Sequence, residues 1–247
     1  MFNNVTKVKA MTKNQLCCLN QFKGCSEFLG YIEDELRIDN WLIWDESLSA
    51  RANYLDEGKK GTDEINIAYE TLQRNASQNG ISAEPGEIVS WLDTLRILFD
   101  AMLEIDLPED ISKELTIIQE YRVPFTTKRA DYLLIYKNRI LILEFSQDNS
   151  DSTKYSSKLQ QVLGYKELLS VLCPENIEIG VYVYLIKTES IVPYNRFVHI
   201  DKHTLANYKN TCTLAQYIRI FFTKEMNDNA IRQLYFLDVD EKYSTKR

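Results

Sequence analysis

The sequence of 247 residues lacks several features that would place it in a specialised class of protein. No apolar run approaches the roughly 18–20 residues that a membrane-spanning helix needs. The first residues also lack the apolar block of a secretory signal. The five cysteines are odd in number and follow no framework spacing, so we expect reduced thiols in the cytoplasm and no membrane association.

Motifs for ATP hydrolysis and for thiolate metal centres are also missing. Residues 58–62 contain two lysines between glycines, but the spacing of a phosphate-binding loop is absent, so we expect no ATPase activity in this chain. The two histidines, His199 and His203, have no evident third ligand, and we interpret them as unrelated surface residues. No Cys-x-x-Cys pair occurs, and an iron–sulfur cluster is not supported.

Charge is present in abundance but is unevenly distributed. The formal net charge is −7, which argues against a protein that coats nucleic acid non-specifically. Residues 31–120 contain 21 acidic and 7 basic residues, whereas residues 121–170 contain 5 acidic and 8 basic residues. We therefore expect local phosphate contacts in the basic stretch, weak affinity of the isolated chain for nucleic acid, and dependence on a partner.

The hydrophobic pattern predicts an α/β fold with a central mixed β-sheet flanked by helices. Residues 1–80 are the least readable part, and we expect a helical accessory or docking region there. A second domain of residues 81–247 would follow, with its core at about 84–190. The expected strands are 116–125, 130–136, 139–145 and 178–187, and the expected helices are 63–74, 85–102, 153–172, 213–224 and 230–237.

Two acids interrupt neighbouring apolar strands of this expected sheet. Asp131 lies in the strand at 130–136 and Glu144 near the end of the strand at 139–145. An acid in an apolar strand is costly unless it is paired or binds a cation. Because Lys137-Asn138 forms a tight turn between the strands, the two carboxylates can converge at one edge of the sheet. Two converging carboxylates suit a hard divalent cation such as Mg²⁺.

A polar stripe on the following helix can complete such a site. Lys154, Lys158, Gln161 and Tyr165 are spaced four, three and four residues apart, so they share one face of the helix. The opposite face carries an apolar stripe of Leu159, Val162, Leu163, Leu169 and Leu172. A solvated helix face is the alternative interpretation of the polar stripe. For the two acids, the alternative is salt bridges to Arg129 or Arg139.

The order of these motifs resembles the PD-(D/E)XK nuclease superfamily, and in particular its RecB-like type with a Gln-x-x-x-Tyr helix. Gln161 and Tyr165 match that helix signature. The chain is most similar to nuclease domains fused to superfamily 1 helicases of antiviral defence and DNA repair. The matching motifs are Trp91, Glu120-Tyr121-x-x-Pro124, Lys128-Arg129-x-Asp131, Glu144, and Gln161 with Tyr165.

The resemblance implies a restriction-endonuclease-like core and a Mg²⁺- or Mn²⁺-dependent nuclease acting on DNA, with RNA as an alternative substrate. Asp131 and Glu144 would bind the metal, Lys158 would stabilise charge, and Gln161 and Tyr165 would support the site. The candidate phosphate contacts are Lys128, Arg129 and Lys154, and the tentative further metal ligands are Glu120 and Glu87. A helicase or other ATPase is the expected partner.

One departure from the family pattern leaves two interpretations open. The family places a lysine two residues after the strand glutamate, and this chain has Ser146 there. A neutral hydroxyl is a poor substitute for an ammonium group beside the attacked phosphate. Either Lys158 supplies the missing charge from the helix, or the chain is an inactive nuclease-fold subunit that binds nucleic acid or acts as a scaffold.

Overall fold

The computed structural model describes residues 16–39, 41, 48–56, 63–146, 152–186, 194–201, 204–209 and 214–223. Its helical elements are α1 (Cys25–Gly30), the π-helix η1 (Tyr31–Leu36), α2 (Leu48–Asp56), α3 (Asp63–Gln78), α4 (Pro85–Glu104), α5 (Glu109–Glu114), α6 (Ser152–Leu172) and α7 (Leu214–Thr223). Its strands are β1 (Asn20–Lys23), β2 (Thr116–Arg122), β3 (Arg129–Tyr136), β4 (Arg139–Ser146), β5 (Glu178–Leu185), β6 (Tyr194–Asp201) and β7 (Thr204–Lys209).

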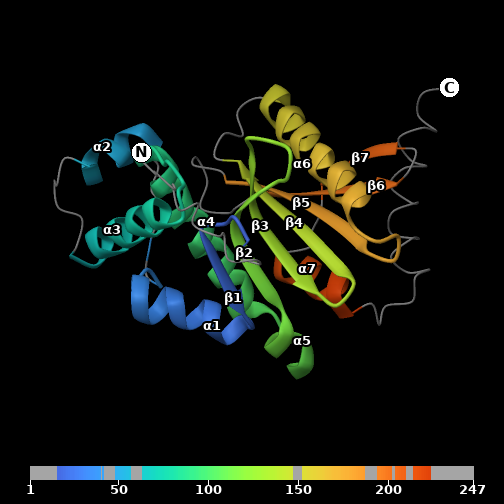
Figure 1. Ribbon diagram of the computed structural model, residues 1–247, viewed down its shortest axis with the longest axis horizontal. Coiled ribbons are helices and arrows are strands. Elements are labelled where there is room, and N and C mark those ends of the chain that lie inside the picture. Colours follow the sequence, from blue (N-terminus) through green and yellow to red (C-terminus); the bar gives the residue numbers. More distant parts are fainter. Residues whose placement is uncertain are drawn as a thin grey trace, which may run out of the picture.

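The strands form one mixed sheet in chain order, β1 to β7, which confirms the predicted fold class (Figure 1). Neighbouring strands are antiparallel except β4 and β5, which are parallel. A parallel pair needs a long crossover, and α6 supplies it. No helix within the described residues is long and apolar enough to cross a membrane.

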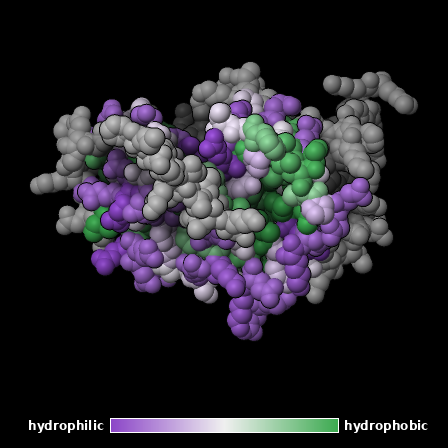
Figure 2. All heavy atoms as spheres, viewed as in Figure 1, coloured by the Kyte–Doolittle hydropathy of each residue, from purple (hydrophilic) through white to green (hydrophobic). Residues whose placement is uncertain are grey.

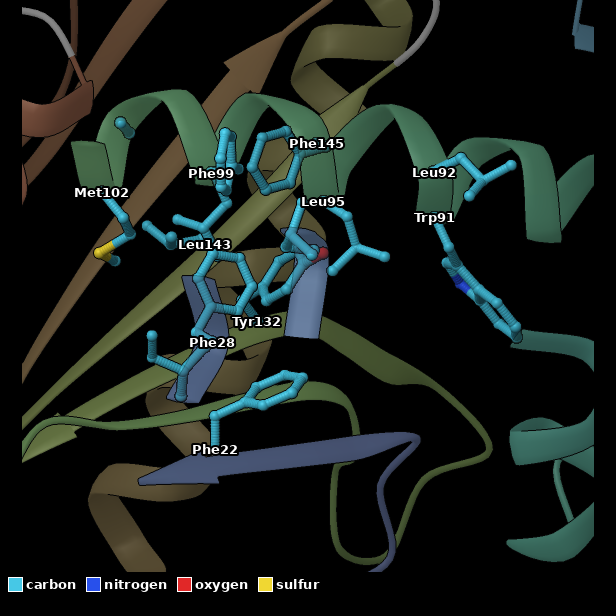
Figure 3. Close-up of a cluster of buried hydrophobic side chains, with 14 of the residues drawn as sticks. Phe22, Phe28, Trp91, Leu92, Leu95, Phe99, Met102, Tyr132, Leu143 and Phe145 are labelled. Atoms are coloured by element: carbon cyan, nitrogen blue, oxygen red, sulfur yellow. The ribbon is translucent and has the colours of Figure 1, made fainter. Parts of the chain in front are cut away.

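Helices cover both faces of the sheet. On one face, α6 packs through Leu159, Val162 and Leu169. On the other face lies the larger core, in which α4 is the central helix. Figure 3 shows the side chains of α4 directed toward the sheet residues Tyr132 and Leu143. The strands are therefore apolar on both faces, as the short continuous hydrophobic runs predict.

From residue 63 onward the structure contains the four predicted strands and the helices predicted at 63–74, 85–102, 153–172 and 213–224. The sequence pattern does not predict α5, β6 and β7, and two details of the predicted elements also differ. The strand predicted at 116–125 ends at Arg122, because the chain turns at Pro124. Leu172, assigned to the apolar stripe of α6, is 44% exposed because the helix ends there, beyond the edge of the sheet. Hydrophobic residues also gather over α6 in Figure 2, and Val171 is 82% exposed. The helix predicted at 230–237 lies outside the described residues.

Residues before 81 join the same sheet and core as the rest of the chain. The hydrophobic pattern does not predict β1, yet β1 pairs with β2, with Asn20 opposite Gln119. The Asn20 amide donates a hydrogen bond to the Gln119 side chain at 2.9 Å. The helices α1, η1, α2 and α3 contribute to the same hydrophobic cluster as α4. The region expected to be an accessory layer thus supplies an edge strand of the sheet.

A buried ion pair connects α2 to α4. The two terminal nitrogens of the Arg51 guanidinium each donate to the Asp93 carboxylate at 2.7 Å, and both side chains are fully buried. The Trp41 indole donates to the same carboxylate at 2.9 Å. A buried charge is costly unless it is paired and hydrogen-bonded in this way. Since α4 also borders the candidate site described below, these contacts link Trp41 and α2 to the helix that positions the site.

We predict that Asp93→Ala lowers the free energy of unfolding by about 3–5 kcal/mol, because it leaves the Arg51 charge buried without its carboxylate. Denaturant titration followed by circular dichroism measures the change. Asp100→Ala is the matched control on the same helix: Asp100 pairs with Arg96 but is half exposed, so its loss costs at most about 1 kcal/mol. Equal effects of the two substitutions would contradict the structural role assigned to Asp93.

Candidate functional site

Asp131 and Glu144 hold the ends of β3 and β4 together where the strand pairing stops. The last paired residues are Tyr132 and Leu143. Beyond them, Glu144 Oε1 accepts a hydrogen bond from the Asp131 backbone N–H at 3.1 Å, and Asp131 Oδ2 accepts one from the Phe145 N–H at 2.7 Å. The two carboxylates thus replace ladder hydrogen bonds, and their positions are fixed by the backbone of the opposite strand.

The alternation of side chains between the two faces of the sheet shifts by one residue at this point. Ile118 and Tyr121 are three positions apart, yet both pack in the cluster on the α6 face. Ala130 and Leu133, also three positions apart, pack in the same cluster. Regular strands place only residues an even number apart on one face. The Glu120 backbone, with a φ of 53°, accounts for the shift in β2. In β3 the shift directs Asp131 toward α6 and Arg129 toward α4.

Helix α6 brings Lys158 and Gln161 to the two acids. Lys158 Nζ lies 2.6 Å from Glu144 Oε2 and 3.7 Å from Asp131 Oδ2. Gln161 Nε2 donates to Glu144 Oε2 at 3.3 Å. Ser146, two residues after Glu144 on β4, is buried and carries no charge. An ammonium group therefore reaches both carboxylates from the crossover helix α6.

The Gln-x-x-x-Tyr spacing has a direct structural explanation. Residues four apart lie side by side on a helix, and Gln161 Nε2 donates to the Tyr165 hydroxyl oxygen at 2.7 Å. The Tyr165 hydroxyl then donates to the backbone carbonyl of Arg129 at 3.2 Å. This chain of hydrogen bonds connects Glu144 to the first residue of β3 and holds α6 against the opening between β3 and β4.

Arg129 occupies the opposite side of the site and is held by two acids. Its Nε donates to Glu120 Oε2 at 2.7 Å, and an NH2 group donates to Glu87 Oε1 at 2.6 Å. The second oxygen of Glu87 accepts the backbone N–H of Glu84 at 3.2 Å, where α4 begins. Arg129, predicted as a phosphate contact, thus positions β2, β3 and α4. Glu120 and Glu87, predicted as tentative metal ligands, both pair with this guanidinium.

These side chains surround a pocket of about 380 Å³ between α4, α6 and the start of β3. Three acids (Glu87, Glu120, Asp131) and three bases (Lys128, Arg129, Lys158) line it, so the lining is balanced in charge. Ser90, Trp91, Thr94 and Thr127 complete the wall. The sequence offers no signal for the two threonines and the serine, because the docking of α4 places Ser90 and Thr94 here and the turn between β2 and β3 places Thr127. Lys154 lies on α6, but its side chain is outside the described part of the structure.

Burial dominates the electrostatics of the site. The Glu144 side chain is fully buried, and this burial together with the nearby Asp131 charge raises its pKa, while the Lys158 ammonium group opposes the rise by stabilising the carboxylate. Burial likewise raises the pKa of Glu120 to about 8, with Asp131 adding to the rise and Arg129 opposing it. Burial lowers the pKa of Lys158, but the Asp131 and Glu144 carboxylates outweigh it, so the net pKa is raised. Lys158 is therefore a protonated cation at neutral pH.

The oxygen donors of Asp131 and Glu144 suit a magnesium ion better than a softer metal, and of the two only Asp131 lines the pocket. Mg²⁺ is commonly held by one or two carboxylates, with waters and substrate phosphates completing its coordination. Asp131 lines the pocket, and within the described residues its Oδ1 atom accepts no hydrogen bond. No group of three or more His, Cys, Asp or Glu side chains suited to a metal is found in that part of the chain. The donor set thus suits a hydrated cation, and not an all-protein cage.

We predict that Lys158→Met lowers the free energy of unfolding by about 3 kcal/mol, because the buried Glu144 carboxylate loses its cation. The double variant Lys158→Met with Glu144→Gln is expected to recover most of this loss, since the amide oxygen can still accept the Asp131 N–H. Denaturant titration in the presence of a chelator measures the free energy of unfolding of both variants without any contribution from bound metal. A Lys158→Met variant as stable as the parent would contradict the ion pair.

The site was compared with known proteins once its geometry was established. Searches against protein-family models, curated proteins and solved structures find no match to this chain. The functional argument therefore depends on the residues of the site themselves.

Proposed function

We propose that this protein is a Mg²⁺- or Mn²⁺-dependent nuclease that hydrolyses phosphodiester bonds in DNA, with RNA as the alternative substrate. The observation that carries the proposal is the position of the Lys158 ammonium group beside both the Asp131 and the Glu144 carboxylates. Two carboxylates at the ends of adjacent strands and a cation from α6 suit metal-assisted phosphoryl hydrolysis. The relocated lysine supplies the charge that Ser146 cannot.

The chemistry assigns a separate task to each side chain. Water attacks phosphorus, the bond to one sugar oxygen breaks, the attacking water loses a proton to solvent, and the departing oxygen gains one from solvent. Asp131 and Glu144 would hold the divalent cation, which would supply a bound water of lowered pKa and polarise the phosphate. Lys158 stabilises the negative charge that develops on the phosphate oxygens. Gln161 and Tyr165 keep Glu144 and α6 in position.

The charge distribution supports a partner that delivers the substrate. The pocket lining is balanced in charge, and the whole chain carries a net charge of −7. Electrostatic attraction of free DNA is therefore weak. We propose that a helicase or another ATPase brings the nucleic acid to the site within a complex for defence or repair. The surface formed by residues before 81 is the proposed docking site for that partner.

A second function, an inactive nuclease-fold subunit, is favoured by one observation. Both oxygens of the fully buried Glu144 already accept hydrogen bonds, from the Asp131 N–H, from Lys158 and from Gln161. These protein donors satisfy the carboxylate, so the fold does not require a metal ion. A chain that kept the architecture for binding or assembly would retain the same contacts.

The nuclease proposal predicts that Asp131→Asn and Lys158→Ala each lower metal-dependent cleavage by roughly 100-fold or more, as expected when a group that stabilises the transition state is lost. Cleavage of labelled single- and double-stranded DNA in Mg²⁺ or Mn²⁺ provides the measurement, and EDTA should abolish it. Lys137→Ala, which removes an exposed lysine at the β3–β4 turn, is the matched control and should leave cleavage unchanged.

Unchanged cleavage in both Asp131→Asn and Lys158→Ala would exclude this site as the source of activity. The inactive-subunit alternative makes a different prediction. It requires that the parent chain binds no Mn²⁺ in calorimetry and cleaves no substrate.

Tyr165 tests whether the hydrogen-bonded support of Glu144 matters for activity. Tyr165→Phe removes the hydroxyl between Gln161 and the Arg129 carbonyl, and we expect cleavage to fall about 10-fold or more, as for other residues that orient metal ligands. Tyr136→Phe is the matched control, because it removes a hydroxyl that donates to Asp110 at 2.8 Å outside the site. Each substitution should cost about 1 kcal/mol of stability. Equal activity of the two variants would contradict a positioning role for Tyr165.

A further inference from the structure

The loop between β2 and β3 presents an aromatic ring to solvent in an unfavourable backbone conformation. Phe125 is 89% exposed, and its φ is 61°. Left-handed backbone is rare for bulky residues and costly for them, whereas glycine adopts it freely. Residues held in such conformations cluster at functional sites. Burial does not explain the ring, because almost none of it is covered.

Hydrogen bonds hold the turn that carries Phe125 in a fixed conformation. The Val123 N–H donates to the Lys128 carbonyl at 3.1 Å, and the Thr126 N–H donates to the Val123 carbonyl at 3.2 Å. The Thr126 hydroxyl donates to the Val123 carbonyl at 2.9 Å and accepts the Lys128 N–H at 3.1 Å. Val123 itself is fully buried against the α6 face. The ring therefore projects from a fixed support, which lowers the entropy cost of binding through it.

Phe125 lies next to the candidate site. Thr127 and Lys128, two and three residues further on, line the pocket. Two residues span at most about 7 Å of extended chain, so the Phe125 backbone lies within about 7 Å of the pocket-lining Thr127. Arg122 and Lys128, which flank the turn, are exposed. An exposed aromatic ring between two cations matches the chemistry of single-stranded nucleic-acid binding, in which bases stack on rings and cations contact the backbone.

We propose that Phe125 is a stacking platform for an unpaired base adjacent to the phosphodiester in the pocket, and that Lys128 contacts the backbone beside it. The preferred substrate is then a single strand or a frayed end, because a paired base inside a duplex has no free face for the ring. Single exposed apolar residues are common on protein surfaces. Phe125 differs from such residues in its left-handed backbone, its hydrogen-bonded turn and the two cations that flank it. This inference rests on the proposed function in taking nucleic acid as the ligand.

The test is a binding measurement with the full chain in an Asp131→Asn background, which prevents cleavage. Fluorescence anisotropy compares three labelled probes of about 12 nucleotides or base pairs, within the site size of single-strand binders. The probes are oligothymidylate, an abasic strand of the same length, and a blunt duplex. The abasic strand keeps the phosphates and removes the bases, so it separates stacking from charge.

We expect Phe125→Ala to weaken oligothymidylate binding roughly 10-fold to 100-fold, the range for loss of one stacked base, with the abasic strand and the duplex unaffected. Phe125→Trp should restore the affinity. Lys128→Ala should weaken binding of the oligothymidylate and the abasic strand alike. Val171→Ala, which truncates another highly exposed apolar side chain at the far end of α6, is the matched control and should change nothing.

Phe125→Gly guards against a folding artefact. Glycine relieves the left-handed strain, so the melting temperature of the Phe125→Gly variant should equal or exceed that of the parent. Its affinity for oligothymidylate should fall as in Phe125→Ala. The inference is overturned if either variant binds oligothymidylate like the parent, or if all three probes lose affinity equally. It is also overturned if the parent binds no nucleic acid, in which case the ring would be a contact for a protein partner.

The binding test and the cleavage test can overturn the stacking role and the nuclease proposal independently. A chain that cleaves DNA while Phe125→Ala keeps its single-strand affinity overturns the stacking role and leaves the nuclease proposal standing. A chain that cleaves nothing but loses single-strand affinity in Phe125→Ala supports the stacking role and indicates an inactive binding subunit.

Discussion

The buried carboxylate of Glu144 is the constraint on which the rest of the site depends. A charge with no solvent exposure needs donors on every side, and here they come from three places in the chain. β3 supplies the Asp131 N–H, and α6 supplies Lys158 and Gln161. Satisfying one side chain therefore fixes the position of the crossover helix over the ends of two strands, and the pocket exists because of that placement.

A second set of contacts extends this constraint across the sheet. The shift in side-chain alternation at Glu120 and Asp131 directs the acid toward α6 and Arg129 toward α4. Arg129 then joins β2, β3 and the start of α4 through two carboxylates. Further along α4, Asp93 pairs with the buried Arg51. The site is thus connected through one helix to the residues before 81, where a partner would dock.

The local elements were largely predictable because their signals are local. The amphipathic period and Pro85 mark α4, and the Lys137-Asn138 pair marks the turn between β3 and β4. The polar stripe of α6 also predicted that Lys158, Gln161 and Tyr165 share one face. The short strand β1 gives no such signal, because four residues are too few for a period and its pairing partner lies about a hundred residues away.

The sequence by itself determined the order of the elements and the residue types available for chemistry: two acids on adjacent strands and a helix with a lysine on its polar face. Only the tertiary structure decided how those residues are used. It placed Lys158 against Glu144, it paired Arg129 with Glu87 and Glu120, and it left Phe125 exposed in the turn that leads to the pocket-lining Thr127 and Lys128. The reason is that periodicity fixes which side chains share a face, whereas pairing and burial depend on which elements pack together.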